Sequence, residues 1–310
     1  MILEIKPTVL VLLASYNGDR WIRDQLNSIL SQVDVNVRVL ISDDSSSDQT
    51  RTIIDEFMSV DSRISVLPQG IYSGSSGKNF YRLMLDCDVK NIDFIAFSDQ
   101  DDLWEHRKLI SATTSLNKYN CGGYSCAVKA FWEDGRSRLI TQSNKILPLD
   151  FIFEGAGQGC TFVIPSNIFL KVKNFILKNK SLVNEFFFHD WLVYILIRCW
   201  GYSWIFDDRP WLLYRQHAEN VNGSRGNLSA VFSRLKLIRS GWYSKQIDLA
   251  INITIFNKYS NEFFINFINL YKNKSNTVIR TQLLLMIIRF SRRKLLDRLV
   301  LSIALIIGWL

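Results

Sequence analysis

The stretch Ser98-Asp99-Gln100-Asp101-Asp102 is the most informative part of this chain, because it directly follows the apolar run Asp93-Phe94-Ile95-Ala96-Phe97. That run is bounded by turn-type residues and predicts a buried strand. Three carboxylates at the end of a strand repel one another and lose solvation, and a bound cation relieves both effects. Two carboxylates one residue apart can reach the same hard divalent ion, which can also hold the phosphates of a substrate. The alternative is an acidic turn in which Asp102 caps a helix that begins at Leu103.

The flanking sequence alternates between strand and helix patterns. Apolar runs predict three more strands, at Thr8–Ala14, Val35–Ile41 and Arg63–Leu67. Apolar residues at helical spacing predict the helices between them, at Arg20–Gln32, from Asp48 to Phe57, and from Lys78 to about Leu85. This alternation predicts an α/β fold with a Rossmann-like mixed, mostly parallel sheet flanked by helices on both faces.

Polar clusters follow three of the predicted strands. They are Ser15-Tyr16-Asn17, Asp43-Asp44 and the run from Asp99 to Asp102. In parallel α/β sheets, ligands bind outside the carboxyl ends of the strands. We therefore expect the three clusters to form one site.

The pattern becomes less regular after about residue 120. Strands are predicted at Tyr124–Trp132 and Arg138–Ile140, and a glycine-rich loop at residues 155–160 precedes another strand. His189-Asp190-Trp191 opens an apolar helix that runs through Cys199. Two short strands are then predicted, at Tyr202–Phe206 and Trp211–Tyr214, and the second leads into Arg215-Gln216-His217.

The basic excess of the chain is confined to its C-terminal part. The net charge is +8, yet the last 90 residues alone hold 14 Lys and Arg against 3 Asp and Glu. This contrast predicts two parts, residues 1–223 and a basic, aliphatic helical region at residues 224–310. In the second part, the cluster Ser291-Arg292-Arg293-Lys294 lies between aliphatic stretches, which is typical of a segment lying in or shallowly inserted into a membrane surface. The final apolar run of 12 residues, Leu299 to Leu310, is shorter than the ~20 residues that span a bilayer. The alternative is a helical subdomain that packs its aliphatic side on the first part.

The cysteines predict a reduced, cytoplasmic protein. There are five, an odd number, and none are spaced as paired metal ligands. The residues from Met1 to Leu13 lack a basic region and a small-residue cleavage site, so they favour a first strand over a signal peptide. Together with the C-terminal region, this predicts a cytoplasmic protein associated peripherally with the inner face of the cell membrane.

In this order, the motifs resemble family 2 glycosyltransferases of the GT-A fold over roughly residues 8–223. The segments that carry the resemblance are Ala14-Ser15-Tyr16-Asn17-Gly18, Ser42 to Asp48, Ser98 to Asp102, Gly159-Cys160-Thr161 and His189-Asp190-Trp191. Within the family, further segments are similar to bacterial rhamnosyltransferases that build O-antigen or capsule repeat units. They are Asn79-Phe80, the Ser-Asp-Gln-Asp-Asp form, and Tyr214-Arg215-Gln216-His217 followed by Asn220 and Gly223.

The resemblance implies an inverting transfer of one sugar from a nucleotide-activated donor. It assigns the nucleotide sugar to six residues: Ala14, Tyr16, Asp43, Asp44, Asp99 and Arg215. In this assignment Tyr16 and Asp44 hold the pyrimidine base, Asp43 lies near the ribose, and Arg215 closes over the diphosphate. A Mg²⁺ or Mn²⁺ cofactor is implied, with Asp101 as its ligand, assisted by Asp99 and His217. Asp190 matches the catalytic base that deprotonates the acceptor hydroxyl.

The chemistry agrees with these roles. A departing diphosphate needs charge stabilisation, which a divalent ion supplies. An attacking alcohol needs a positioned carboxylate to take its proton, which is worth about 10²–10⁴-fold in rate. Inversion requires one such base, and Asp190 beside an apolar helix is expected to have a raised pKa.

The expected function is transfer of L-rhamnose from dTDP-rhamnose to a polyprenyl-diphosphate-linked saccharide at the cytoplasmic membrane surface. Other donors, such as UDP-galactose or UDP-GlcNAc, remain open, and no nucleic-acid partner is expected. The processive Gln-x-x-Arg-Trp motif is absent, which argues against a polymerising synthase.

Several alternatives stay open. Asp43-Asp44-Ser45 can be a turn and helix cap. His189-Asp190 can be an N-cap pair, and His217 a structural histidine. A core position is expected for four tryptophans, although one of them can stack on an acceptor sugar: Trp191, Trp200, Trp204 and Trp211. A phospho-accepting receiver domain would need only ~120 residues and explains neither Asp190 nor the tail. A non-catalytic membrane scaffold is disfavoured by the intact Asp44, Asp101 and Asp190.

Overall fold

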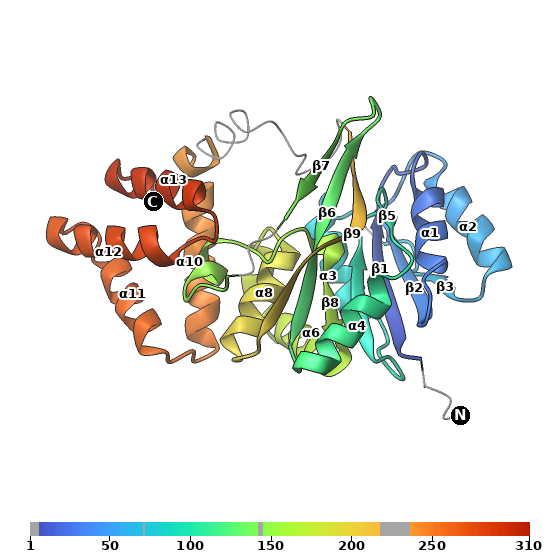
Figure 1. The fold of residues 1–310 in the computed structure, drawn as a ribbon, viewed down its shortest axis with the longest axis horizontal. Coiled ribbons are helices and arrows are strands. Elements are labelled where there is room, and N and C mark those ends of the chain that lie inside the picture. Colours follow the sequence, from blue (N-terminus) through green and yellow to red (C-terminus); the bar gives the residue numbers. More distant parts are fainter. Residues whose placement is uncertain (1–5, 71, 142–144, 218–235) are drawn as a thin grey trace.

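The computed structural model describes residues 6–70, 72–141, 145–217 and 236–310. One sheet runs through the molecule, with strand order β3-β2-β1-β4-β8-β6-β9-β5 and β7 paired to β6 (Figure 1). The strands are β1 (Thr8–Ser15), β2 (Asn36–Asp43), β3 (Ile64–Val66), β4 (Phe94–Ser98), β5 (Leu103–Trp104), β6 (Gly123–Trp132), β7 (Ser137–Ile140), β8 (Val163–Pro165) and β9 (Trp204–Gln216). From β3 to β4 the pairing is parallel, and beyond β4 it is mixed, because β8 is antiparallel to both β4 and β6.

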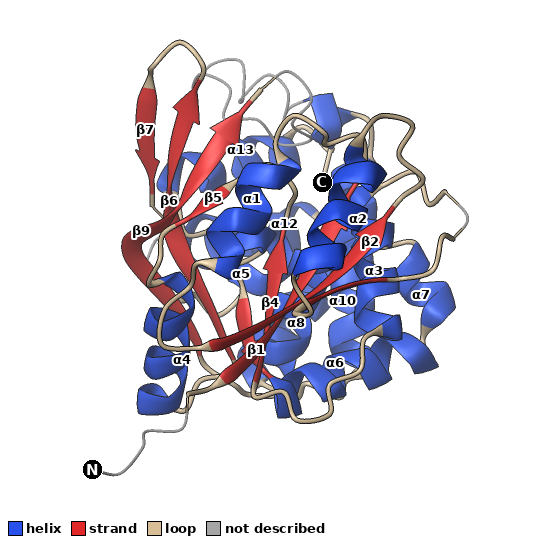
Figure 2. Cartoon of the chain, turned by 90° about the vertical axis from the view of Figure 1, so that its right-hand side faces the viewer, coloured by secondary structure: helices blue, strands red, loops and turns tan. Residues whose placement is uncertain are grey.

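Helices cover both faces of the sheet (Figure 2). The sequence of β1 is continuously apolar because both faces of this strand are covered. Val11 packs in the core beneath one set of helices, and Leu12 packs in the core beneath the other. The first set is α1 (Ile22–Leu30), α2 (Thr50–Val60) and α4 (Lys108–Tyr119). The second set is α3 (Ser76–Asp86), α6 (Ser166–Lys178) and α8 (His189–Cys199).

The C-terminal helices extend the second core. The remaining helices are α5 (Asp150–Phe153), α7 (Lys180–Asn184), α10 (Trp242–Phe256), α11 (Glu262–Lys272), α12 (Thr277–Phe290) and α13 (Leu295–Ile306). In Figure 1, the orange and red helices α10 to α13 lie together at one side of the molecule, and α10 packs against α8 and α5. Apolar residues of α10 to α13 belong to the same continuous core as α8. The predicted boundary at residues 223 and 224 lies outside the described residues. No helix among the described residues is both long and apolar enough to cross a bilayer.

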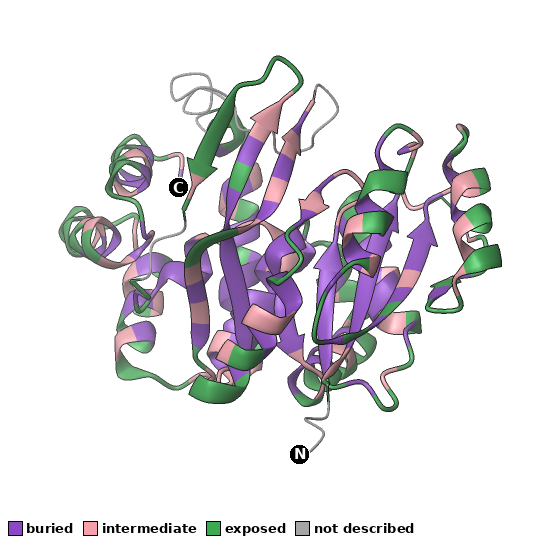
Figure 3. Ribbon diagram, turned by 45° about the vertical axis from the view of Figure 1, so that its right-hand side comes forward, coloured by how far each residue is buried: buried purple, intermediate pink, exposed green. Residues whose placement is uncertain are grey.

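The basic cluster of the C-terminal region is largely internal. Arg293 donates from Nη1 to Asp150 Oδ2 at 3.1 Å and from its backbone to Glu154 Oε1 at 2.6 Å. Arg292 lies 3.3 Å from Glu154 and 3.6 Å from Asp297. Two of the charges expected at a membrane surface therefore join the C-terminal region to α5 and its C-cap, Glu154. The outer faces of α12 and α13 remain largely exposed (Figure 3).

Two local expectations are wrong. Asp102 does not cap a helix, because Leu103–Trp104 forms β5 and α4 begins only at Lys108. The two short strands predicted at Tyr202–Phe206 and Trp211–Tyr214 are one long strand, β9, which pairs with β6 across a bulge.

Candidate active site

The carboxyl ends of β1, β2 and β4 meet at one edge of the sheet, as the sequence predicts. Ser15 pairs with Asp43, and Leu13 pairs with Ser98. The buried amide of Asn79 on α3 ties two of these ends together. Its Nδ2 donates to the carbonyl of Ser42 at 2.9 Å and to that of Ser15 at 3.3 Å. All three polar clusters therefore face the same region.

Two tyrosine rings stand at the outer side of this edge. Tyr16 is 44% exposed and Tyr72 is 54% exposed, and their ring centroids lie 5.3 Å apart at 40°. The side-chain amide of Gln100 holds the backbone of Tyr16 from both sides, because Oε1 accepts from its N–H and Nε2 donates to its carbonyl, each at 2.8 Å. This close approach requires Gly18, since a Cβ there would lie 2.3 Å from Gln100 Cδ. The pair offers exposed aromatic faces for a planar ring.

The two carboxylates at the end of β2, Asp43 and Asp44, already accept hydrogen bonds within the protein. Asp43 accepts from the Ser15 hydroxyl and the Ser46 backbone, each at 3.1 Å, so it shapes the turn, which agrees with the turn alternative for that residue. Asp44 accepts from Ser73 N at 2.7 Å, from Ser73 Oγ at 2.8 Å and from Gly74 N at 3.2 Å. A carboxylate has about four acceptor positions, so Asp44 retains room for one more donor such as the N–H of a base.

The end of β9 holds the acidic motif in place. Arg215 donates from Nε to the carbonyl of Asp101 at 2.9 Å and from its backbone to Asp102 Oδ1 at 3.3 Å. His217 Nε2 lies 2.8 Å from Asp101 Oδ2, and its ring stacks on Trp21 with centroids 4.0 Å apart. The expected association of Arg215 and His217 with the acidic motif is therefore present.

Burial and charge repulsion raise the pKa values of two carboxyls in the motif, those of Asp99 and Asp102. Burial raises the pKa of Asp99 to about 7, assisted by the charges of Asp101 and Asp190. Burial likewise raises the pKa of Asp102 well above its usual value, with Asp101 and Asp99 contributing. Ligand atoms of Asp99, Asp102 and Cys160 lie within 4.8 Å of one another. Because a cation lowers the cost of ionising such carboxylates, this concentration of acid fits a divalent ion.

The donor types decide which residues suit that ion. Burial raises the pKa of the Cys160 thiol well above its usual value, so Cys160 stays a neutral thiol and is a poor ligand for a hard cation. Asp101 and His217 instead bring a carboxylate oxygen and an imidazole nitrogen together from separate segments. Of the three predicted metal ligands, Asp101 and His217 lie together and carry donor types that suit Mg²⁺ or Mn²⁺. The ligand atoms of Asp99 instead group with those of Asp102 and Cys160.

Asp190 lies in the first turn of α8, near enough to Asp99 for its charge to help raise the pKa of that carboxyl. Burial raises its own pKa to about 6, as expected from its apolar helix. The residue that precedes the helix is Phe188, so Asp190 is not the N-cap. Gly159 permits the approach of the opposite loop, because a Cβ there would lie 3.1 Å from Asp190 Cβ.

The neighbouring histidine has a structural role. His189 is buried, stacks on Phe80 with centroids 3.9 Å apart, and has a pKa lowered to about 3 by burial. A neutral His189 lends Asp190 no positive charge, which leaves the carboxylate basic. Asp190 therefore has the raised pKa that the sequence predicts, and its role as the base stays a prediction.

Sequence reasoning missed two contributors. Tyr72 had no motif around it, and its placement depends on how the Gly/Ser loop folds back onto Asp44. Gln100 was part of a quoted motif, but its amide bridge to Tyr16 joins segments 84 residues apart. The other predicted residue, Ala14, is buried next to the end of β1. Asn220 and Gly223 lie outside the described residues.

Comparison with known proteins agrees with this arrangement. Residues 10–186 match the family model described as Glycosyl transferase family 2. The chain is 40% identical over 255 residues to the dTDP-rhamnosyl transferase RfbG of Shigella flexneri, covering 82% of this chain and 86% of that protein. It is 35% identical over 112 residues to the UDP-Glc:alpha-D-GlcNAc-diphosphoundecaprenol beta-1,3-glucosyltransferase WfgD of Escherichia coli, covering 36% and 42%.

A solved structure shares the fold. The mannosyltransferase PcManGT from Pyrobaculum calidifontis, in complex with GDP-Man and Mn²⁺, matches with a TM-score of 0.51 at 13% identity, over 98% of this chain and 87% of that one. The mixed α/β architecture is the GT-A fold that the resemblance implied. With its family match over more than half of its length and a relative aligned over most of both chains, this chain belongs to glycosyltransferase family 2 and is a glycosyltransferase.

Proposed function

We propose that this enzyme transfers one L-rhamnose, with inversion, from dTDP-rhamnose to a lipid-linked saccharide during synthesis of a bacterial surface polysaccharide. The 40% identity to a dTDP-rhamnosyl transferase over 86% of its length supports the donor. The similarity to WfgD, whose name specifies a diphosphoundecaprenol-linked acceptor, supports the lipid carrier. O-antigen and capsule repeat units are the products that fit this combination.

The observation that carries the mechanism is the position of Asp190. It is a single carboxylate with a pKa near 6, and it lies near Asp99 of the acidic motif. It takes the proton of the acceptor hydroxyl while that oxygen forms a bond to the anomeric carbon of the sugar. On the opposite side, the bond from that carbon to the diphosphate oxygen breaks. One base and one displacement give inversion.

The remaining residues bind and orient the donor. The rings of Tyr16 and Tyr72 stack on the base, and Asp44 accepts its ring N–H. Arg215 neutralises charge on the diphosphate from the end of β9. A Mg²⁺ or Mn²⁺ ion held by Asp101, with Asp99 and His217, would stabilise the departing diphosphate.

A UDP-sugar donor is the second candidate, because WfgD is named as a UDP-glucose enzyme. The two are separated by incubating the enzyme and Mn²⁺ with dTDP-rhamnose, UDP-glucose or UDP-GlcNAc and a lipid-linked acceptor extract. Transfer from dTDP-rhamnose alone supports the proposal. Transfer from a UDP-sugar instead would keep the enzyme class and remove rhamnose, and no transfer from any donor would favour a non-catalytic scaffold.

We further propose that the protein associates peripherally with the inner face of the cytoplasmic membrane. The support is the exposed aliphatic face of α13, formed by Leu295, Leu296, Leu299, Ile303 and Ile306, beside the exposed Lys294. Such a location would bring the enzyme to an acceptor whose lipid lies in the membrane.

A further inference from the structure

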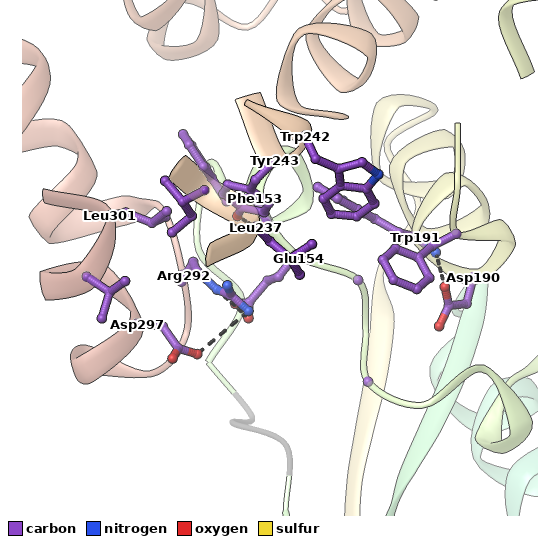
Figure 4. Close-up of a pocket in the computed structure, with 15 residues that line it drawn as sticks. Phe153, Glu154, Asp190, Trp191, Leu237, Trp242, Tyr243, Arg292, Asp297 and Leu301 are labelled. Carbon is purple, nitrogen blue, oxygen red and sulfur yellow. Dashed lines mark hydrogen bonds and ion pairs between the residues drawn. The ribbon is translucent and has the colours of Figure 1, made fainter. Parts of the chain in front are cut away.

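A cavity of about 280 Å³ lies where the C-terminal helices meet the catalytic part of the chain. Figure 4 shows the labelled side chains around it: Asp190 lies at one end, the Arg292–Asp297 pair at the other, and Trp191 and Trp242 between them. Its volume is just below the ~300–1,000 Å³ typical of ligand pockets, so it suits a single ring better than an oligosaccharide.

The wall of this cavity is largely aromatic. Trp242 opens α10, and its ring meets those of Phe187 and Phe188 edge-on, with centroids 5.6 and 5.8 Å away. Such edge-to-face contacts are favourable and hold the ring of Trp242 in place at the wall of the cavity. Trp242 is partly exposed and lines the cavity. The apolar C–H face of a sugar packs on such a surface.

The charged groups of the cavity suit hydroxyls better than phosphate. Its described lining holds three carboxylates, those of Glu154, Asp190 and Asp297, and one cation, Arg292. That guanidinium is already paired, lying 3.3 Å from Glu154 and 3.6 Å from Asp297. Among the described lining residues, therefore, every cation is committed to a carboxylate, and a phosphate would meet repulsion from Asp190. Sugar hydroxyls instead donate well to carboxylates.

We infer that this cavity is the acceptor subsite, that it takes one neutral sugar ring with a hydroxyl at Asp190, and that Trp242 is the face on which this ring stacks. The inference rests on the proposed function and adds the chemical class of the group bound. The diphosphate of the carrier lies outside the cavity. The C-terminal helices are then part of the active site, because α10 and α13 supply Trp242, Asp297 and Leu301.

The test uses the full chain with dTDP and Mn²⁺ and four neutral probes, the n-octyl glycosides of N-acetylglucosamine, glucose, galactose and rhamnose. Saturation-transfer NMR reports which sugar protons contact the protein, and titration gives Kd. At least one glycoside should bind through its ring. Trp242→Ala should weaken that binding by up to about tenfold, and Trp242→Phe should restore most of it. Phe256→Ala, a matched control at the other end of α10 and outside the cavity, should leave Kd unchanged.

A competition experiment tests whether the cavity binds the sugar or the diphosphate. Excess n-octyl diphosphate should fail to displace the bound glycoside. Displacement by the diphosphate, retention of full affinity in Trp242→Ala, or binding of none of the four glycosides would each overturn the inference. Melting temperatures of the variants show whether each is folded.

Measuring nucleotide binding separately distinguishes failure of the acceptor assignment from failure of the proposed function. If dTDP and UDP fail to raise the melting temperature of the wild-type protein, the transferase proposal fails whatever the glycosides do. If a nucleotide binds and the glycosides do not, the acceptor assignment alone fails.

Discussion

Asp190 is the residue on which transfer should depend most strongly. Asp190→Asn keeps the shape of the side chain and removes its basicity, so we expect kcat to fall by about 10²–10⁴-fold. Because the asparagine cannot take a proton at any pH, the loss should not be repaired at high pH. Binding of dTDP, measured by thermal shift, should be unchanged. Asp88→Asn, at an exposed carboxylate remote from the site, is the control. Near-normal kcat in Asp190→Asn would remove this residue as the base.

The pKa of Asp190 also predicts the pH dependence of the wild-type enzyme. Burial raises this pKa to about 6, and only the ionised form is a base. The rate should therefore be nearly constant above pH 7 and should fall as pH drops through about 6, by about tenfold for each further unit. Measuring kcat against pH with saturating donor checks this. A rate that stays level down to pH 4.5 would contradict it.

Tyr72 is expected to contribute to nucleotide affinity, although no sequence motif marks it. A base stacked on an aromatic ring is stabilised by about 1–3 kcal/mol, so Tyr72→Ala should weaken dTDP binding by about 5- to 150-fold. Tyr72→Phe keeps the ring and should bind normally. Tyr119→Ala, an exposed tyrosine on α4, is the matched control. Isothermal titration with dTDP and Mn²⁺ measures all four proteins, and equal affinities would place the base elsewhere.

At the level of single residues, the sequence pattern identified the acidic side chains, and the family resemblance identified Arg215 and His217 beside the acidic motif. Neither identified the partners of Asp44. Asp44 and Asp101 stand out because carboxylates after strands are conspicuous along the chain, and Asp190 stands out because it opens an apolar helix. The partners of Asp44 are in a loop 29 residues later, and those of Asp101 are 114 and 116 residues later. Hydrophobic periodicity carries no information on contacts between residues so far apart in the sequence. The positions of Tyr72, Trp21 and Trp242 at the site could therefore not be predicted from it.

At the level of elements, the strands buried on both faces were predicted to within two residues. The prediction Thr8–Ala14 compares with Thr8–Ser15 in β1, because a continuous apolar run has one plausible structure in a covered parallel sheet. β9 was predicted as two strands, since Asp207 to Pro210 resemble a turn. In the structure Asp207 pairs with Cys126 and Pro210 pairs with Ala127, so only Asp208 and Arg209 bulge out and the strand continues.

The buried ion pairs that join the C-terminal region to α5 and to its C-cap, Glu154, should be important for stability. Asp150 is fully buried and is paired with Arg198 at 2.8 Å and with Arg293 at 3.1 Å. Arg293→Ala leaves carboxylates at Asp150 and Glu154 with fewer partners, so we expect a loss of about 3–5 kcal/mol in unfolding free energy. Its neighbour Lys294 is exposed, and Lys294→Ala should change stability by less than about 0.5 kcal/mol. Urea unfolding followed by circular dichroism measures both, and similar values for the two variants would refute the structural role of Arg293.

At the level of the whole molecule, the donor and acceptor halves of the site come from different parts of the chain. The sheet edge at β1, β2 and β4 presents the groups for the nucleotide, whereas α8 and the C-terminal helices surround the cavity beside Asp190. Because α10 packs on α8 and shares its core, the C-terminal region has a fixed place relative to the base. A C-terminal region that both contributes to the acceptor cavity and contacts lipid would keep a membrane-borne acceptor within reach of Asp190.

We also predict that the molecule contacts the membrane through α13. Leu296 is 58% exposed and Ile303 is 53% exposed, and they lie seven residues apart on the same side of the helix. Changing both to glutamate places two charges on the surface expected to contact lipid and adds repulsion from anionic headgroups. Sedimentation with vesicles of phosphatidylglycerol and phosphatidylethanolamine should therefore recover the wild-type protein and leave the double variant in solution. Val60→Glu, at an 83% exposed position on α2, is the control and should sediment normally. Transfer to a short-chain soluble acceptor should be unaffected in the double variant, because neither residue lines the acceptor cavity. If the double variant sediments with vesicles as fully as the wild type, α13 is not the membrane-binding face.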